Sequence, residues 1–174
     1  MWRNGIALCL VAGGVIALLP AGSGAASGDE PPGRNCTIFG TAGDDVIEGT
    51  PGPDRICARG GADWIYAHGG NDLVWTGEGD DFVVAGAGND RVWGGRGHGS
   101  DKLIGQGGND WLWGRAGYDI FSGGGGRDHL HGGRGVDAMY SADRPPLRDW
   151  VRGGRGKDVV DADRLDVVTS AKRD

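Results

Sequence analysis

Aspartates recur every nine residues along most of this chain, each behind a glycine-rich segment and two places ahead of a large apolar residue. Carboxylates repeated in this way could supply oxygen ligands to a hard metal ion. They could also be ordinary turn formers that bind nothing. Turn chemistry alone would let Asn and Ser alternate with Asp, yet successive repeats all carry Asp, which favours metal binding. The series is Asp45, Asp54, Asp63, Asp72, Asp81, Asp90, Asp101, Asp110, Asp119, Asp128, Asp137, Asp149 and Asp158.

The short fixed period predicts how these residues are held. Each unit is one turn and one short strand, which can bury its apolar residue only against neighbouring units, so the repeats must form a solenoid. Glycines permit the positive φ angles of tight turns. The three residues after each Asp should point outward, inward and outward. The inward column is Ile47, Ile56, Ile65, Val74, Val83, Val92, Leu103, Leu112, Phe121, Leu130, Met139, Val151 and Val160.

The clearest unit, residues 132–140, reads G-G-R-G-V-D-A-M-Y and fits the pattern G-G-x-G-x-D-x-U-x, where U is a large apolar residue. Residues 123–131 and 153–161 match it as closely, and three other units match at most positions. In these repeats the chain resembles the repeats-in-toxin (RTX) family of bacterial extracellular proteins. The resemblance implies an all-β fold, a parallel β-roll (a β-helix-like solenoid) in which two nonapeptides complete one coil.

We expect four segments: a signal peptide over 1–26, an N-terminal cap over 27–39, the β-roll over 40–161, and a C-terminal cap or tail over 162–174. The aspartate spacing slips by two residues near 97–100 and by three near 142–148. The register across these interruptions is open. Asp101 and Asp149, which follow them, are therefore doubtful ligands.

The resemblance also implies the ligand, which is Ca²⁺, bound as several ions between adjacent turns. Aspartate carboxylates and backbone carbonyls of the turns would hold the ions, and all-oxygen coordination suits this cation. The implied carboxylates are Asp45, Asp54, Asp63, Asp72, Asp81, Asp90, Asp110, Asp119, Asp128, Asp137 and Asp158. The implied glycine ligands are Gly86, Gly88, Gly105, Gly107, Gly123, Gly125, Gly132 and Gly135.

The composition indicates why such ions would matter. The chain has 38 glycines, 24 acidic and 18 basic residues, and only 38% hydrophobic residues. Ordering the backbone costs about 1–2 kcal/mol per residue, and a core one residue wide offsets little of that. We therefore expect a largely disordered metal-free state that folds on Ca²⁺. The net charge of −6 argues against a nucleic-acid partner.

The first residues predict export. Arg3 precedes an apolar stretch over 6–19, and small residues follow Pro20, which is typical of a signal peptide. An uncleaved membrane anchor is the alternative. The family's commonest pattern instead uses a C-terminal export signal, but residues 167–174 are too short and too charged to establish one. We expect a secreted, extracellular protein with no stable membrane span after cleavage.

Cys36 and Cys57 remain after the predicted cleavage, and an even pair in an oxidising compartment favours a disulfide. In the repeat frame the two residues lie on adjacent coils but are offset by three places, about 10 Å along a strand. A bridge therefore requires an irregular first coil. Two free thiols are the alternative.

The outward places hold an aromatic row, Trp75, Trp93 and Trp113, with Trp111 beside it. If the first interruption stays in its turn, these rings lie about 4.8 Å apart on one sheet. Such a face could bind a carbohydrate or another protein. Alternatively, cross-strand stacking only stabilises the sheet. Both interpretations stay open at this point.

No catalytic motif accompanies the repeats: the chain has no H-E-x-x-H, no G-x-S-x-G and no phosphate-binding lysine loop. We therefore predict a secreted calcium-ion-binding protein that folds on Ca²⁺ and acts as a non-enzymatic structural or binding module. The alternative is an adhesin-like binder of carbohydrate or cell surfaces that uses the tryptophan face, with calcium purely structural.

Overall fold

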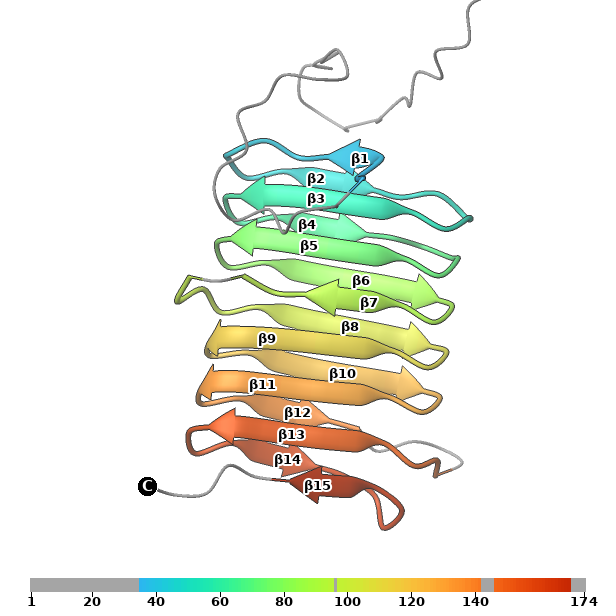
Figure 1. Cartoon of the computed structure of the whole chain (residues 1–174), viewed down its shortest axis with the longest axis vertical. Helices are drawn as coiled ribbons and strands as arrows, with labels where there is room; N and C mark the ends of the chain where they lie inside the picture. The colour runs from blue at the N-terminus through green and yellow to red at the C-terminus, as the bar shows by residue number, and fades with distance from the viewer. Residues whose placement is uncertain (1–34, 96, 142–145, 170–174) are drawn as a thin grey trace, which may run out of the picture.

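The computed structural model describes residues 35–95, 97–141 and 146–169. Within them, fifteen short β-strands are stacked one above another, with no helix (Figure 1). The strands are β1 (Ile38–Phe39), β2 (Val46–Glu48), β3 (Arg55–Gly60), β4 (Trp64–Tyr66), β5 (Leu73–Glu78), β6 (Phe82–Ala87), β7 (Arg91–Trp93), β8 (Lys102–Gly107), β9 (Trp111–Gly117), β10 (Ile120–Gly125), β11 (His129–Gly135), β12 (Ala138–Tyr140), β13 (Trp150–Arg155), β14 (Val159–Asp161) and β15 (Val167–Thr169).

Successive strands alternate between two parallel sheets. The odd-numbered strands form an 8-stranded sheet in the order β1-β3-β5-β7-β9-β11-β13-β15, and the even-numbered strands form a 7-stranded sheet from β14 to β2. Ile56 pairs with Val74 on one sheet and Ile65 with Val83 on the other, so one coil contains two nonapeptides. The fold is the all-β parallel roll that the repeats predict.

The strand register continues unchanged across the two interruptions. Phe82 pairs with Lys102 across the first interruption, and His129 pairs with Trp150 across the second. A slip of one residue would turn every inward side chain outward, so burial of the apolar column fixes the register. The extra residues therefore do not shift the pairing of the described strands.

A single column of apolar side chains fills the space between the sheets. Every predicted inward residue up to Val151 is buried, while Val160 in the last coils is only partly buried against this core. Ile38 of β1 extends the column at the N-terminal end. Small residues such as Ala58, Ala67 and Ala85 are buried beside it, at the point where each strand leads into the next turn.

The roll is longer at both ends than the sequence indicated. β1 lies within the predicted cap over 27–39 but pairs with β3. β15 lies in the predicted tail over 162–174 but pairs with β13, with Val151 opposite Val168. Paired strands therefore extend beyond residues 40–161 at both ends.

A disulfide joins Cys36 to Cys57, with their Cα atoms 6.0 Å apart. Phe39 is the residue opposite Cys57 in the sheet, so Cys36 would be too far away on a straight strand. The chain bends at Thr37, immediately before β1, and this irregular first coil brings Cys36 close. The bridge fastens the N-terminal edge strand to the roll.

The predicted signal peptide lies outside the described residues. Among the residues that are described, no helix is long and apolar enough to cross a membrane.

Candidate metal centre

The aspartates form two ladders, one along each edge of the roll, in the turns that join the sheets. One ladder precedes the odd-numbered strands, and the other precedes the even-numbered strands. The first contains Asp54, Asp72, Asp90, Asp110, Asp128, Asp149 and Asp166, and the second contains Asp45, Asp63, Asp81, Asp101, Asp119, Asp137 and Asp158.

Except in the first coil, one oxygen of each carboxylate accepts a hydrogen bond that holds the fold together. Oδ1 accepts a hydrogen bond from the backbone N–H of the aspartate in the preceding coil, as in the pair of Asp54 N–H and Asp72 Oδ1 at 2.8 Å. The remaining rungs span 2.8–3.1 Å. These bonds hold neighbouring turns together and fix where the second carboxylate oxygen lies.

The second oxygen, Oδ2, is buried and has no hydrogen-bond donor in many central coils. This holds for Asp63, Asp72, Asp90, Asp110, Asp119 and Asp137. Leaving a buried acceptor without a partner costs about 1–3 kcal/mol, and more when the group is charged. A row of such oxygens calls for a positively charged ligand.

The turns leave no room for a side chain next to these oxygens. A Cβ at Gly105 would overlap Oδ2 of Asp110, and a Cβ at Gly132 would overlap Oδ2 of Asp137. Neighbouring backbones are as close: a Cβ at Gly88 would overlap the carbonyl oxygen of Gly70 in the preceding coil. The glycines are therefore required to bring carbonyl and carboxylate oxygens together.

Burial raises the pKa of these carboxyls. Loss of hydration is the largest cause, neighbouring aspartates add to it, and the rung hydrogen bond opposes it. The pKa rises to about 7 for Asp63, Asp110 and Asp119, and burial also raises that of Asp90. The groups raised to about 6 are Asp72, Asp101 and Asp137. Near neutral pH the buried carboxylates of the ladders must therefore bind either protons or a cation.

Side chains alone do not make a complete coordination sphere. In the part of the chain that the structure describes, no three His, Cys, Asp or Glu side chains gather where they could hold a metal ion. Backbone carbonyls must complete any site. Of the predicted carbonyl ligands, Gly107 and Gly125 each already accept a backbone hydrogen bond at 2.8 Å from the neighbouring coil. A carbonyl oxygen has two lone pairs, so this use does not prevent coordination.

The donor set fits calcium. It is anionic, contains only oxygen, and mixes carboxylates with carbonyls, as a hard cation of flexible geometry requires. The unsatisfied Oδ2 atoms lie in buried, glycine-lined turns where such an ion would have both kinds of donor. When bound, Ca²⁺ would supply the positive charge that the buried carboxylates lack.

Together the fold and the ladders define a parallel β-roll of the calcium-binding kind. The model of one family, the RTX calcium-binding nonapeptide repeat, matches the chain in four copies, at residues 39–74, 66–101, 104–139 and 148–165. The chain belongs to this family. No curated protein matches the chain.

Three ladder aspartates lie outside the predicted set of ligands. Asp101 and Asp149 were doubtful after the interruptions, yet both accept the rung hydrogen bond from the preceding coil. Asp166 was missed altogether, although the N–H of Asp149 donates to its Oδ1 at 3.0 Å. Asp166 follows Asp149 by 17 residues instead of 18, which hides it from the period. The sequence signal that could have revealed Asp166 is the Asp-Val-Val-Thr segment, in which the aspartate directly precedes β15.

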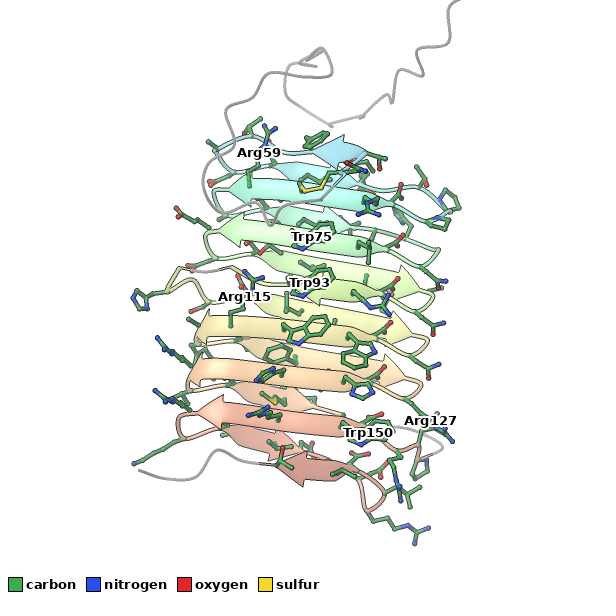
Figure 2. The ribbon with its side chains drawn as sticks, viewed as in Figure 1. Arg59, Trp75, Trp93, Arg115, Arg127 and Trp150 are labelled. Atoms are coloured by element: carbon green, nitrogen blue, oxygen red, sulfur yellow. A yellow bond between two sulfur atoms is a disulfide. The ribbon has the colours of Figure 1, made fainter. Side chains whose placement is uncertain are left out.

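The three tryptophans of the row form a stack in which neighbouring rings lie face to face. Ring centroids are 4.9 Å apart for Trp75 and Trp93 and 5.0 Å apart for Trp93 and Trp113, with planes within 4° of parallel. Figure 2 shows Trp75 above Trp93 in the middle of the front sheet. Each ring face covers the next ring, and Trp75 is only 9% exposed. The row therefore presents ring edges, not ring faces, along most of its length.

A second stack runs beside the first, closer to the start of the strands. His129 lies between Trp111 and Trp150, at centroid distances of 3.9 Å and 4.6 Å. The ring of Trp111 also contacts the ring of Trp113, with an angle of 33° between the two planes, and this contact links the two stacks. Trp111 and Trp150 are 39% and 38% exposed. The structure thus brings the predicted partner-binding residues together, but their rings contact mainly one another. These residues are Trp75, Trp93, Trp111 and Trp113.

Proposed function

We propose that this protein is an exported module whose fold depends on Ca²⁺ and which serves a structural or binding role without catalysis. The observation that carries the proposal is the row of buried carboxylates whose Oδ2 atoms have no donor. Membership of the RTX calcium-binding repeat family supports the identity of the cation.

The fold should depend on calcium because burying the carboxylates of the ladders without a metal ion costs free energy. At neutral pH the buried carboxylates must either bind protons above their usual pKa or stay charged without a counter-ion. The core contributes little compensation, because most strands bury a single large side chain between the sheets. Free energy of ion binding would then become free energy of folding.

Export is supported by two features of the chain. The apolar stretch over 6–19 with its basic start has the pattern of a signal peptide. The disulfide between Cys36 and Cys57 suits an oxidising compartment. Calcium outside the cell is abundant enough for weak extracellular modules, which bind at roughly 10⁻⁴–10⁻³ M.

The stacking geometry disfavours the carbohydrate-binding alternative. Sugar rings pack on an exposed aromatic face, whereas Trp93 has both faces covered by Trp75 and Trp113. The row is better suited to stabilising the sheet across its strands. We therefore assign Trp75, Trp93 and Trp113 a structural role and keep the calcium-dependent module as the proposal.

The test is a far-ultraviolet circular dichroism titration of residues 27–174 with Ca²⁺ after chelation, with Mg²⁺ as the control. The proposal predicts a cooperative gain of β signal with Ca²⁺ alone. A β spectrum that is the same in chelator would show that the carboxylates are only turn formers.

A further inference from the structure

The aspartate turns occur in two forms, which differ at the residue four places before the aspartate. In nine of the turns whose second residue is described, this second residue of the repeat has a positive φ. In the turns of Asp45 and Asp54 the second residue is Thr41 or Thr50, and neither has a positive φ. We call the nine turns open and the two threonine turns closed. The open second residues are Arg59, His68, Gly77, Gly86, Gln106, Arg115, Gly124, Gly133 and Gly154.

In the closed turns, Oδ2 of the aspartate is already satisfied. The backbone N–H of Thr50 donates to Oδ2 of Asp54 at 2.6 Å, and the Thr50 hydroxyl donates to the same oxygen at 3.0 Å. Thr41 makes the same two bonds to Asp45, at 2.6 Å and 3.0 Å. These two bonds occupy both lone pairs of the oxygen, so at least one donor would have to leave before the oxygen could bind a metal ion.

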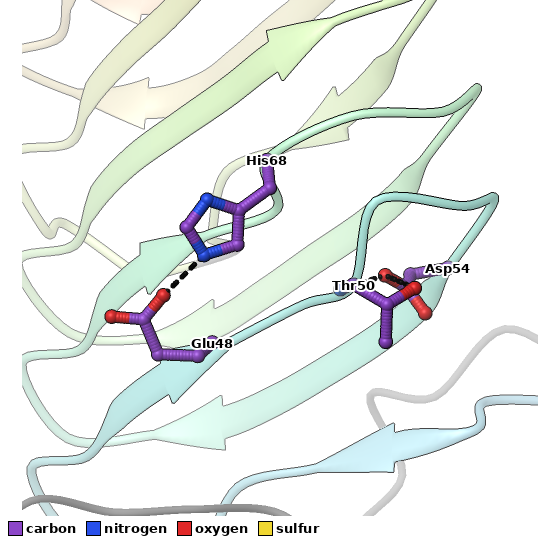
Figure 3. Close-up of polar contacts among 4 residues, drawn as sticks. All are labelled: Glu48, Thr50, Asp54 and His68. Atoms are coloured by element: carbon purple, nitrogen blue, oxygen red, sulfur yellow. Dashed lines mark hydrogen bonds and ion pairs between the residues drawn. The ribbon is translucent and has the colours of Figure 1, made fainter.

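The next coil on the same edge shows the contrast. His68 occupies the place that Thr50 occupies one coil earlier, but its φ is 74° and its side chain points away to pair with Glu48 (Figure 3). Asp72, the aspartate of this turn, has an Oδ2 without a donor. In this pair of turns, the backbone conformation at the second residue distinguishes a satisfied carboxylate from an open one.

Two further turns are closed by other means. In the longer turn before Asp101, the N–H of Gly95 donates to Oδ2 at 3.0 Å, and Gly95 has no positive φ. At the C-terminal end, Oδ2 of Asp166 accepts from the Ser141 hydroxyl at 2.8 Å and from the N–H of Asp163 at 2.9 Å. The closed turns therefore lie at both ends of the roll and at the first interruption.

The open form is strained where the second residue is not glycine. Arg59, His68, Gln106 and Arg115 have φ angles of 74–84°. The left-handed conformation costs roughly 1–2 kcal/mol for such residues. Strain of this kind persists where the surrounding structure or the function requires it. A threonine, being β-branched, resists a positive φ still more strongly. The residue type at this one place can therefore select the form of the turn.

We propose that only the open turns take calcium, and that the second residue of each repeat decides which turns these are. The closed turns of Asp45, Asp54, Asp101 and Asp166 are hydrogen-bonded, metal-free supports at the ends and at the interruption. This inference rests on the proposed function, because it divides the turns of a calcium-dependent roll into two classes. It also removes Asp45 and Asp54 from the ligands that the sequence predicts.

The test compares Asp54→Asn with Asp72→Asn, which change neighbouring rungs of one ladder. Calcium ions are counted on the folded chain by native mass spectrometry, and the calcium midpoint is measured by circular dichroism. Asp72→Asn should lower the number of bound ions by at least one and raise the midpoint several-fold. Asp54→Asn should keep the wild-type count. Equal losses from the two variants would overturn the proposal.

A second pair of variants tests the second residue directly. Thr50→Gly permits a positive φ and removes the hydroxyl, so we expect this variant to bind at least one more ion than the wild type. Thr50→Val removes the hydroxyl but remains β-branched, so its count should not change. An unchanged count for Thr50→Gly would refute the role of the second residue. If the wild-type chain binds no calcium at all, the proposed function itself fails.

Discussion

Replacing Asp110 by asparagine should affect the metal-free and calcium-bound chains in opposite directions. The Oδ2 atom of Asp110 is buried without a donor, and burial, with charges on Asp128 and Asp90, raises its pKa from 3.8 to about 7. Because the folded pKa lies above the unfolded one, the metal-free fold is most stable below pH about 4 and loses stability as the pH rises to about 7. Three units of pKa correspond to about 4 kcal/mol.

The amide side chain introduced by this substitution would resemble the protonated carboxyl in size and charge. We therefore expect Asp110→Asn to stabilise the metal-free chain at pH 8 by up to about 4 kcal/mol and to have little effect at pH 4. With calcium the same change removes an anionic ligand, so the calcium midpoint at pH 8 should rise.

Circular dichroism in chelator between pH 3 and pH 9 measures the first effect. The wild-type β signal should grow as the pH falls from 7 to 4, and Asp110→Asn should keep that signal to higher pH. The exposed Asp44, changed to asparagine, serves as a matched control for loss of one charge. If Asp110→Asn destabilised the chain equally in chelator and in calcium, the account of the buried carboxylate would be wrong.

Three further predictions concern stability. Cys57→Ser opens a loop of 21 residues, and should lower the calcium-bound stability by about 3 kcal/mol in urea unfolding; no loss would mean that the first coil does not depend on the bridge. Trp93→Ala removes two stacked contacts worth about 0.5–1.5 kcal/mol each beyond lost burial, while glycan-array binding should stay at background before and after the change. Gln106→Gly relieves a φ of 78° and should raise the thermal midpoint, whereas Gln106→Ala keeps the strain and should not. Equal midpoints for the two Gln106 variants would contradict the strain argument.

The sequence predicted the solenoid because the repeat itself carries the information. The alternation after each Asp placed Val83, Leu112 and Phe121 inside, and all three are buried. The period also placed the ladder aspartates at equivalent turns. The period did not predict Asp166, because the spacing from Asp149 to Asp166 is one residue shorter than in the regular repeats.

Other features depend on geometry that the period does not encode. The bend at Thr37 allows the Cys36 bridge, and a count of residues along straight strands could not have indicated it. The parallel stacking of Trp75 on Trp93 depends on side-chain torsions, so the sequence could not distinguish a stack from an exposed platform. The closed state of Asp54 depends on the φ of Thr50, although the threonines were visible in the repeat.

Amide hydrogen exchange tests the central claim most directly, because the backbone N–H groups that donate to the carboxylates report on the ladders. With saturating Ca²⁺, segments that contain Asp72, Asp90 and Asp110 should be strongly protected, since their N–H groups form the rungs. In chelator at pH 8 the same segments should exchange within seconds. Equal protection in both conditions would show that the roll does not need calcium, and would contradict the account.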